Sequence, residues 1–512
     1  MATEKRGMRS RRISSGIKGL DTVLFGGFLR GGVYIFIGPP GAGKTILANQ
    51  IAFAHAASGG RVLYVSLLAE SHARLFMHME NLDFFDESRV AESMNYVSGY
   101  TILEKEGLPG LLTLLRKEMQ SRKATMLVLD GLVSAEAFAQ TSLEMKKFIH
   151  ELQTIVALLE CTAFLLTSGS NPRLGTPEHT MVDGLVELTN DVIGVRQLRL
   201  LNVKKFRGSQ HLGGTHCFDI TSRGITIYPR LEALVTATPR AAHEDSRSAS
   251  TGISELDAMF SGGVSRGCPT LVLGPSGSGK TIVSLHFLAA GVRAGENCLY
   301  LSFNEPPERL LSKAARIGLD LQPYVDRGVL QLIWHPSVDL LADAIAHEVL
   351  ESVRTHSIKR VVIDSLMGFK DAIMVAERTQ RFLAAFTNEL SVAGATTYLC
   401  EETRALFSPG VEVPVTGVST FVDNILFVRQ VEVDGELCRI VAVLKTRESP
   451  RDAALRQFTI SAKGMIVTGA LHDAEAILTG SAHSTRRRSD LTRKVGKKKT
   501  KSKSQGKRRG GT

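Results

Sequence analysis

The sequence carries one glycine-rich pattern twice. It reads GPPGAGKT at residues 38–45 and, 236 residues later, GPSGSGKT at residues 274–281. Both stretches match G-x-x-x-x-G-K-[ST], the pattern of a loop whose backbone N–H groups surround phosphate oxygens. One match alone is modest evidence, whereas two in the same surroundings leave little room for chance. We therefore expect two phosphate-binding loops, each placed between a strand and a helix.

The surroundings of the two loops repeat as well. The pairs at the same offset are Gly16-Ile17 with Gly252-Ile253, Leu20-Asp21 with Leu256-Asp257, Gly26-Gly27 with Gly262-Gly263, and Arg30-Gly31 with Arg266-Gly267. A duplicated domain is the simplest explanation. Between the halves, the polar stretch TATPRAAHEDSRSAS indicates a linker. We expect a first domain at residues 1–235, a linker at 236–247 and a second domain at 248–470.

The net charge of +11 is concentrated at the C-terminus. Residues 481–512 hold 13 Lys and Arg against one acid, Asp490, so the rest of the chain is nearly neutral, at about −1. This stretch has few apolar residues to bury, and we expect a disordered basic tail over residues 471–512. A nearly neutral body argues against a basic nucleic-acid-binding domain, so nucleic acid is a possible partner only through the tail.

Cysteine usage and hydropathy indicate an intracellular protein. The six scattered cysteines form no C-x-x-C pair and have no histidine at metal-ligand spacing, which predicts reduced, mostly buried thiols. The basic N-terminus is not followed by an apolar segment, and no window approaches 18 uninterrupted apolar residues. We expect a cytoplasmic protein that does not bind membranes.

Apolar runs alternate with helical stretches in both halves. Val33–Ile37 predicts a strand that ends in the first glycine loop, and Lys44–Ala56 predicts the helix that follows. Further strands are expected at Val62–Leu67, Met126–Leu129 and Ala163–Leu166, and in the second half at Thr270–Leu273, Cys298–Phe303, Arg360–Ile363 and Thr397–Cys400. This alternation predicts an α/β fold in each half, with a mostly parallel sheet covered by helices on both faces.

The residues of each loop predict roles toward a nucleotide. The glycines that let the backbone turn around a phosphate are Gly38, Gly41 and Gly43 in the first loop and Gly274, Gly277 and Gly279 in the second. The lysines, Lys44 and Lys280, are expected to reach the β- and γ-phosphates. The hydroxyls of Thr45 and Thr281 are expected to ligate Mg²⁺.

Acidic residues at strand ends extend this hypothesis. Asp130 closes the strand MLVLD and Asp364 closes RVVID, where a carboxylate orders Mg²⁺ and its waters, although an aspartate there can also cap a helix. Glu70 and Glu305 follow the next strand after each loop helix and are candidates to activate water. Each is equally compatible with an acid that complements a helix dipole.

Several motifs together resemble the KaiC family of RecA-type ATPases. They are S-x-G-I-x-x-L-D-x-x-x-x-G-G ahead of each loop, Val182-Asp183-Gly184, and KFRGSQH at Lys205–His211. The resemblance covers about residues 13–470 and implies tandem RecA-like domains that bind ATP and Mg²⁺. The family forms two-tiered hexameric rings, which implies that Lys205, Arg207 and His211 contact the ATP of a neighbouring subunit. Lys445 and Arg447 stand at the matching positions of the second domain.

The resemblance also implies autophosphorylation in the second domain. Members phosphorylate an adjacent Ser-Thr pair, and Ser419 and Thr420 stand at that position. One departure opposes this activity, because the family has two adjacent glutamates where this chain has Ala69-Glu70 in the first domain and Asn304-Glu305 in the second. If the first glutamate is the general base, its loss weakens phosphoryl transfer by about 10²–10⁴-fold.

Three functions are consistent with these features. The first is a slow ATP-dependent regulatory ring that acts as a serine/threonine autokinase and is read by signalling partner proteins. The second is a DNA-dependent ATPase similar to recombination ATPases, suggested by the basic tail. The third is a nucleotide-gated scaffold with little turnover, suggested by the missing first glutamate in both domains.

Overall fold

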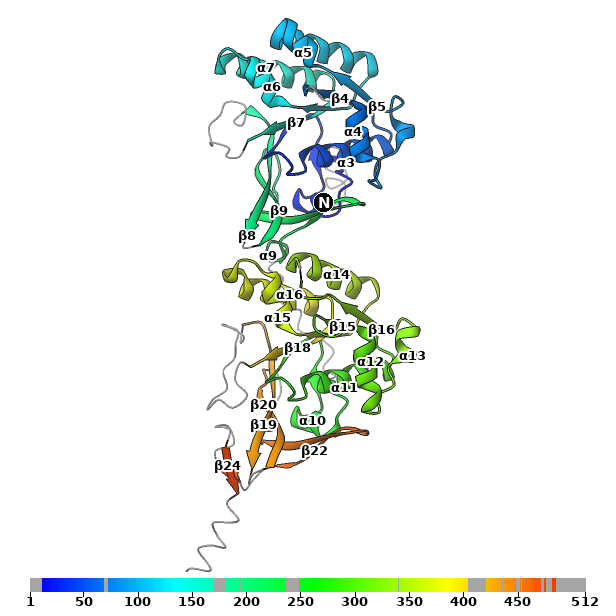
Figure 1. Cartoon of the computed structure of the whole chain (residues 1–512), viewed down its shortest axis with the longest axis vertical. Helices are drawn as coiled ribbons and strands as arrows, with labels where there is room; N and C mark the ends of the chain where they lie inside the picture. The colour runs from blue at the N-terminus through cyan, green and yellow to red at the C-terminus, as the bar shows by residue number, and fades with distance from the viewer. Residues whose placement is uncertain are drawn as a thin grey trace, which may run out of the picture. The chain divides into compact units, whose positions relative to one another are not determined.

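A computed structural model of the chain describes residues 12–68, 72–169, 181–193, 195–235, 248–338, 340–403, 420–433, 436–447, 452, 454–470, 474–475 and 481–484. The chain divides into two compact units, Met1–Leu234 and Val235–Thr512 (Figure 1). Each unit is a large sheet flanked by helices. The fold is therefore the predicted pair of α/β domains with RecA-like sheets.

The first unit contains a nine-stranded sheet. Its strands, in spatial order, are β11 (Gly224–Tyr228), β10 (Thr215–Thr221), β9 (Arg196–Phe206), β8 (Gly184–Ile193), β3 (Val33–Gly38), β7 (Thr162–Ser168), β6 (Met126–Asp130), β4 (Val62–Ser66) and β5 (Met94–Ser98). The six strands from β8 to β5 are parallel, and β9, β10 and β11 continue the sheet antiparallel. The main helices are α3 (Lys44–Ala57), α4 (His72–Met79), α5 (Tyr100–Arg122), α6 (Leu132–Phe138) and α7 (Ser142–Leu158).

The second unit repeats this topology strand for strand. The order is β22 (Gly464–Ala470), β21 (Arg456–Ser461), β20 (Glu436–Lys445), β19 (Asn424–Val433), β14 (Pro269–Gly274), β18 (Thr396–Glu402), β17 (Arg360–Asp364), β15 (Cys298–Ser302) and β16 (Leu330–Trp334). Its main helices are α11 (Lys280–Arg293), α12 (Pro307–Arg316), α13 (Gln322–Asp326), α14 (Ala342–Thr355), α15 (Leu366–Ala372) and α16 (Thr379–Val392). The identical order is what a duplicated domain predicts.

Both faces of the central strands are buried, which explains their continuous apolar runs. In β3, Tyr34 and Phe36 join the core packed under α3, whereas Val33, Ile35 and Ile37 join the core under α5 and α7. Figure 1 shows the sheet of this unit lying between α3 and these two helices. The loop that follows β3 is thus held by a strand with no exposed residue.

The antiparallel strands and the last strands were not anticipated from the sequence. β8 and β9 form a hairpin in which Ile193 pairs with Arg196, and this close return makes the antiparallel direction possible. In the second unit β24 (Ser481–Ser484) pairs in parallel with β19 and antiparallel with β23 (Ala474–Glu475). The described part of the predicted tail therefore includes two short strands, and its basic residues lie outside the described residues.

The described residues can be compared with what cysteine content and hydropathy predict. All six cysteines are free thiols, five of them buried and Cys438 half-buried. Among the described residues, no group of three or more His, Cys, Asp or Glu side chains forms a metal cluster. No helix in the described part of the chain has the length and apolar character needed to cross a bilayer.

Candidate nucleotide-binding sites

Each glycine loop lies between the end of a central strand and the start of a helix. β3 ends at Gly38 and α3 begins at Lys44, with Gly43 at φ 97° as the residue before the helix. A φ in this left-handed region favours glycine, since a side chain there is strained. Gly279 has φ 111° at the same place before α11. In both units the turn directs the N–H groups at a helix N-terminus into the loop, the arrangement that binds phosphate.

The two loop lysines fold back over their own loops. Lys44 Nζ donates hydrogen bonds to Gly38 O at 2.7 Å and Pro39 O at 2.9 Å. Lys280 Nζ donates to the carbonyl groups at the same places in the second loop, both at 2.8 Å. Burial lowers the pKa of Lys44, and the nearby Asp130 carboxylate opposes this effect. Each ammonium group is therefore held against the loop that is expected to bind phosphate.

A hydroxyl, a carboxylate and a tyrosine meet next to each loop. Thr45 Oγ1 donates to Asp130 Oδ2 at 3.1 Å, and Tyr64 Oη donates to the same oxygen at 2.7 Å. Burial and the Asp130 carboxylate raise the pKa of Tyr64, so it remains a neutral donor. Hydroxyl and carboxylate oxygens are ligands that Mg²⁺ prefers, and next to a phosphate loop they fit a Mg-nucleotide. The second unit repeats the cluster with distances of 2.9 Å from Thr281 and 2.6 Å from Tyr300 to Asp364 Oδ2.

Sequence reasoning missed the two tyrosines. Tyr64 lies in β4 and Asp130 ends β6, and the two strands are hydrogen-bonded neighbours in the sheet. The contact depends on this strand order, which the sequence does not state. The offset between Tyr64 and Tyr300, which is the 236 of the two loops, was the signal that would have found them.

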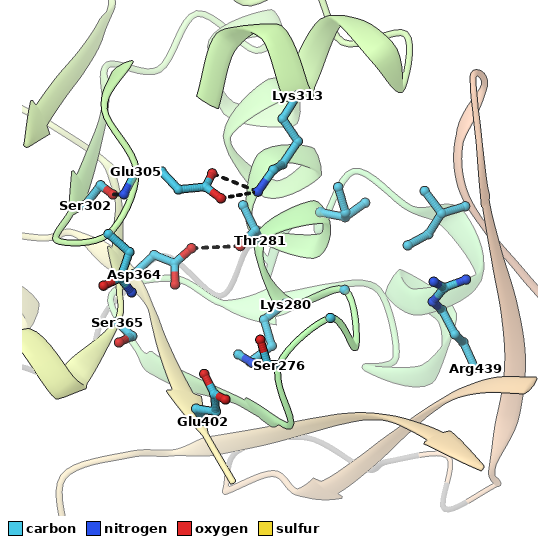
Figure 2. A pocket seen from close by; sticks show the side chains of 15 residues that line it. Ser276, Lys280, Thr281, Ser302, Glu305, Lys313, Asp364, Ser365, Glu402 and Arg439 are labelled. Carbon is cyan, nitrogen blue, oxygen red and sulfur yellow. Dashed lines mark hydrogen bonds and ion pairs between the residues drawn. The ribbon is translucent and has the colours of Figure 1, made fainter. Parts of the chain in front are cut away.

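A pocket of about 600 Å³ opens at the loop of the second unit (Figure 2). Its charged lining residues are Lys280, Lys313, Arg439, Glu305, Asp364 and Glu402. Its other lining residues include Gly277, Gly279, Thr281, Asn304 and Ile460. Apart from Gly274, the predicted loop, metal and water-activating residues of this unit thus share one cavity. Balanced charges and a volume of this size suit a nucleotide.

The predicted water-activating residue of the second unit has an unexpected partner. Glu305 forms an ion pair with Lys313 of α12, whose Nζ lies 2.6 Å from Oε1 and 2.7 Å from Oε2. Figure 2 shows the two side chains pointing toward each other beside Thr281. Asn304, in place of a second acid, lines the same pocket. Glu70, the corresponding residue of the first unit, lies outside the described residues.

Three further charged residues of the lining were missed. Arg439 extends from β20 and, in Figure 2, lies on the other side of the loop from Asp364. It shares the offset of 240 with Arg199, so the repeat carried a signal for it. Glu402 pairs with Gly274 in the sheet, where the first unit has Ser168 opposite Gly38. Neither Glu402 nor Lys313 is repeated in the first unit, so the repeat gave no signal for them.

The cations assigned to a neighbouring subunit's ATP lie away from their own loop. Lys205 pairs with Leu185 near the start of β8, whereas the loop follows Gly38 at the other end of β3. At about 3.3 Å per residue, the intervening residues of β3 separate them by more than about 10 Å. In the second unit, Lys445 pairs with Ile425 near the start of β19, as Lys205 pairs with Leu185 in the first. His211 lies half-buried between β9 and β10.

These cations face carboxylates at the start of β8 and β19. Burial and Arg207 lower the pKa of Lys205, and Asp183 opposes them. In the second unit Lys445 Nζ donates to Val422 O at 2.9 Å, and Arg447 forms an ion pair with Asp423 at 3.2 Å. Lys445 and Arg447 thus do not line the loop pocket of the second unit.

One of the two candidate phosphorylation sites, Thr420, precedes β19. Thr420 is exposed, lies four residues before β19, and accepts a hydrogen bond from Gln380 Nε2 at 3.5 Å. β19 pairs directly with β14, the strand that leads into the glycine loop. Ser419 lies outside the described residues.

Fold and site together define a tandem P-loop nucleotide-binding protein with RecA-like domains. The sequence model of the KaiC ATPase family matches residues 13–232 and again 249–472, so the chain belongs to the KaiC family of ATPases. The circadian clock oscillator protein KaiC of Picosynechococcus sp. is 26% identical over 487 residues, which cover 92% of each chain.

Two proteins of Synechocystis sp. are similar over comparable lengths. The circadian clock protein KaiC3 is 25% identical over 92% of this chain and 94% of its own. The circadian clock protein KaiC2 is 27% identical over 91% of this chain and 83% of its own. The likeness therefore extends over both units, as the resemblance of the motifs predicted.

Proposed function

We propose that the protein is a slow ATP-dependent regulatory ring, in which both units bind Mg-ATP and the second unit phosphorylates Ser419 and Thr420. The observation that supports two working sites is the repeated cluster of Lys, Thr, Asp and Tyr beside both loops. A degenerate copy would be expected to lose at least one of these polar contacts.

Hydrolysis requires few groups. The lysine and the loop N–H groups hold the phosphates, and the threonine and aspartate would hold Mg²⁺, which would supply positive charge beside the transferring group. Water attacks the γ-phosphorus, its proton passes to a glutamate carboxylate, and the bond to the β-phosphate oxygen breaks to leave ADP and phosphate. Glu70 and Glu305 are the proposed acceptors of that proton.

The proposed ring explains the placement of the distal cations. Lys205 and Lys445 lie toward the sheet end away from their own loop, and Arg207 and Arg447 contact the aspartates at that end, Asp183 and Asp423. A cation that is remote from its own nucleotide could contact the nucleotide of a neighbouring subunit. Stabilisation of phosphoryl charge from across an interface would couple turnover to assembly.

Autophosphorylation is tested by mass spectrometry of phosphopeptides after incubation with Mg-ATP. Lys280→Ala disables the second loop alone, and Lys44→Ala serves as its matched control in the first unit. We expect phosphate on Ser419 or Thr420 in the wild type and Lys44→Ala chains and none in Lys280→Ala. ATP hydrolysis without phosphate on either residue would remove the kinase from the proposal.

One observation favours a scaffold with little turnover as a second candidate. In the second unit the first acid is replaced by Asn304, and the remaining acid is paired with Lys313. Such a site can hold ATP without hydrolysing it. Near-stoichiometric ATP recovered from purified protein, with no ADP formed over hours, would favour the scaffold over the enzyme.

A further inference from the structure

We propose that Lys313 is a positioning residue that restrains Glu305 and thereby slows ATP turnover in the second unit. This inference rests on the proposed function, because it concerns the residue that would accept the proton from water. Its basis is the ion pair within the nucleotide pocket, where both Glu305 oxygens contact one ammonium group.

The local structure explains how two residues eight positions apart meet. Glu305 precedes α12 by two residues, and its N–H donates to Ser302 Oγ at 3.0 Å, which fixes the turn after β15. Side chains of a helix lean toward its N-terminus, so Lys313, in the second turn of α12, reaches back over that end. The pair therefore joins a loop to a helix and is not the usual i,i+4 pair of an exposed helix face.

Because the pair lies in the pocket, its two charges attract each other more strongly than those of an ion pair on the open surface. The side chains of Lys313 and Glu305 are 34% and 29% exposed, so water screens them only in part. Lys313 Nζ lies 2.6 Å from one Glu305 oxygen and 2.7 Å from the other. A water that binds either oxygen must therefore compete with the ammonium group. The same ammonium group stabilises the negative charge that proton transfer from water would remove.

No second acid at this turn can take over the role. The residue before Glu305 is Asn304, whose amide cannot accept a proton from water at neutral pH. In the first unit, α4 carries an exposed His78 at the position that Lys313 has in α12, eight residues after the corresponding glutamate. A lysine at this position is therefore a feature of the second unit, and its restraint of Glu305 would make the two units turn over ATP at different rates.

The test uses the full-length chain with Lys44→Ala, so that only the second unit turns over ATP. In this parent, Lys313→Met is expected to raise kcat about two- to fivefold, the range that the removal of a partly exposed ion pair supports, with a smaller change in KM. Lys313→Arg should restore the slow rate. Arg316→Met, which removes an exposed cation from the same helix, is the matched control and should match the parent.

The added variant Glu305→Gln separates restraint from other effects. If Lys313 acts through Glu305, the gain from Lys313→Met disappears in the double variant. A kcat that is unchanged or lower in Lys313→Met overturns the inference, as does a gain that survives Glu305→Gln. A lower kcat with a raised KM would assign Lys313 to phosphate binding instead.

Folding and nucleotide binding are measured in the same samples. Thermal unfolding and ATP binding of Lys313→Met and of a second variant, Lys313→Gln, show whether a change in rate reflects an intact pocket. If the Lys44→Ala parent binds no ATP, the proposed function of the second unit fails, and a role for Lys313 in turnover fails with it. If the parent binds ATP and neither Lys313 variant turns over faster, only the inference fails.

Discussion

The Thr281 hydroxyl donates a hydrogen bond to Asp364 Oδ2 at 2.9 Å, although 83 residues separate the two in the chain. Tyr300 donates to the same oxygen from the neighbouring strand β15. Burial raises the pKa of Tyr300, and the Asp364 carboxylate adds to this effect, so the phenol stays protonated. A neutral donor that cannot titrate near neutral pH thus fixes the carboxylate beside the threonine.

Removing the charge of Asp364 should impair the second unit selectively. In a chain with Lys44→Ala, Asp364→Asn is expected to lower ATP hydrolysis by about 10²-fold, because the developing phosphoryl charge loses its metal-ordering carboxylate. Asp320→Asn changes an exposed acid after α12 and is the control. Hydrolysis is followed by phosphate release at saturating Mg-ATP, and a rate within twofold of the parent would refute a metal role for Asp364.

Removing the tyrosine hydroxyl should weaken the binding of Mg²⁺ more than the binding of ATP. Tyr300→Phe leaves Asp364 with one donor fewer while it keeps the buried ring, and groups that orient a metal-binding carboxylate are worth about 10–100-fold in metal affinity. We therefore expect the Mg²⁺ concentration for half-maximal turnover to rise by about tenfold. Equal Mg²⁺ requirements in the variant and the parent would show that the hydrogen bond has no part in ordering the metal.

The features that the sequence could predict were the local ones. The strands β3, β6 and β14 are buried along their whole length because helices cover both faces of the sheet, and their largely apolar runs can be recognised without a structure. The loop residues are contiguous in the chain. Asp130 and Asp364 were found because a carboxyl end of a strand lies at the loop edge of the sheet in any parallel arrangement.

What the sequence could not predict depends on how segments pack. Lys313 contacts Glu305 only because α12 begins two residues after the glutamate and its side chains lean back. The distance of Lys205 from its own loop follows from the antiparallel register of β8 and β9. The strands β9, β10 and β11 lack the continuous apolar pattern, since their outer residues are half-buried or exposed.

The close contact of Gly274 with a neighbouring strand predicts a loss of stability on substitution. A Cβ at this position would lie 2.0 Å from Val428 O, a backbone atom that cannot move away without distorting β19. We expect Gly274→Ala to lower the free energy of unfolding of the second unit by about 2 kcal/mol or more. Gly469→Ala, with no atom within 4 Å of the added Cβ, should be close to neutral.

The single tryptophan provides the measurement for this pair of variants. Trp334 ends β16 and is 43% exposed, so its fluorescence reports urea unfolding of the second unit. Equal midpoints for Gly274→Ala and Gly469→Ala would mean that the loop relaxes without cost. That result would contradict the tight strand contact described for the second unit.

A buried histidine in the first loop helix makes stability depend on pH. His55 of α3 is 6% exposed, and its Nε2 lies 2.8 Å from Thr125 Oγ1. Burial lowers the pKa of His55 to about 4, and the positive charge of Arg30 contributes. The folded state therefore keeps the ring neutral at a pH at which the unfolded chain, with an ordinary pKa of about 6.5, takes up a proton.

The first unit should consequently lose stability as the pH falls. The contribution of His55 is complete above about pH 6.5, decreases as the pH falls from there toward 4, and amounts to about 2 kcal/mol between pH 7 and 5. His55→Gln cannot take up a proton and should reduce this acid sensitivity by that amount, whereas His150→Gln, at an exposed position of α7, should not. Urea unfolding followed by circular dichroism measures both units, and the Trp334 signal identifies the transition of the second. An unchanged difference between pH 7 and 5 in His55→Gln would mean that other groups govern the acid response.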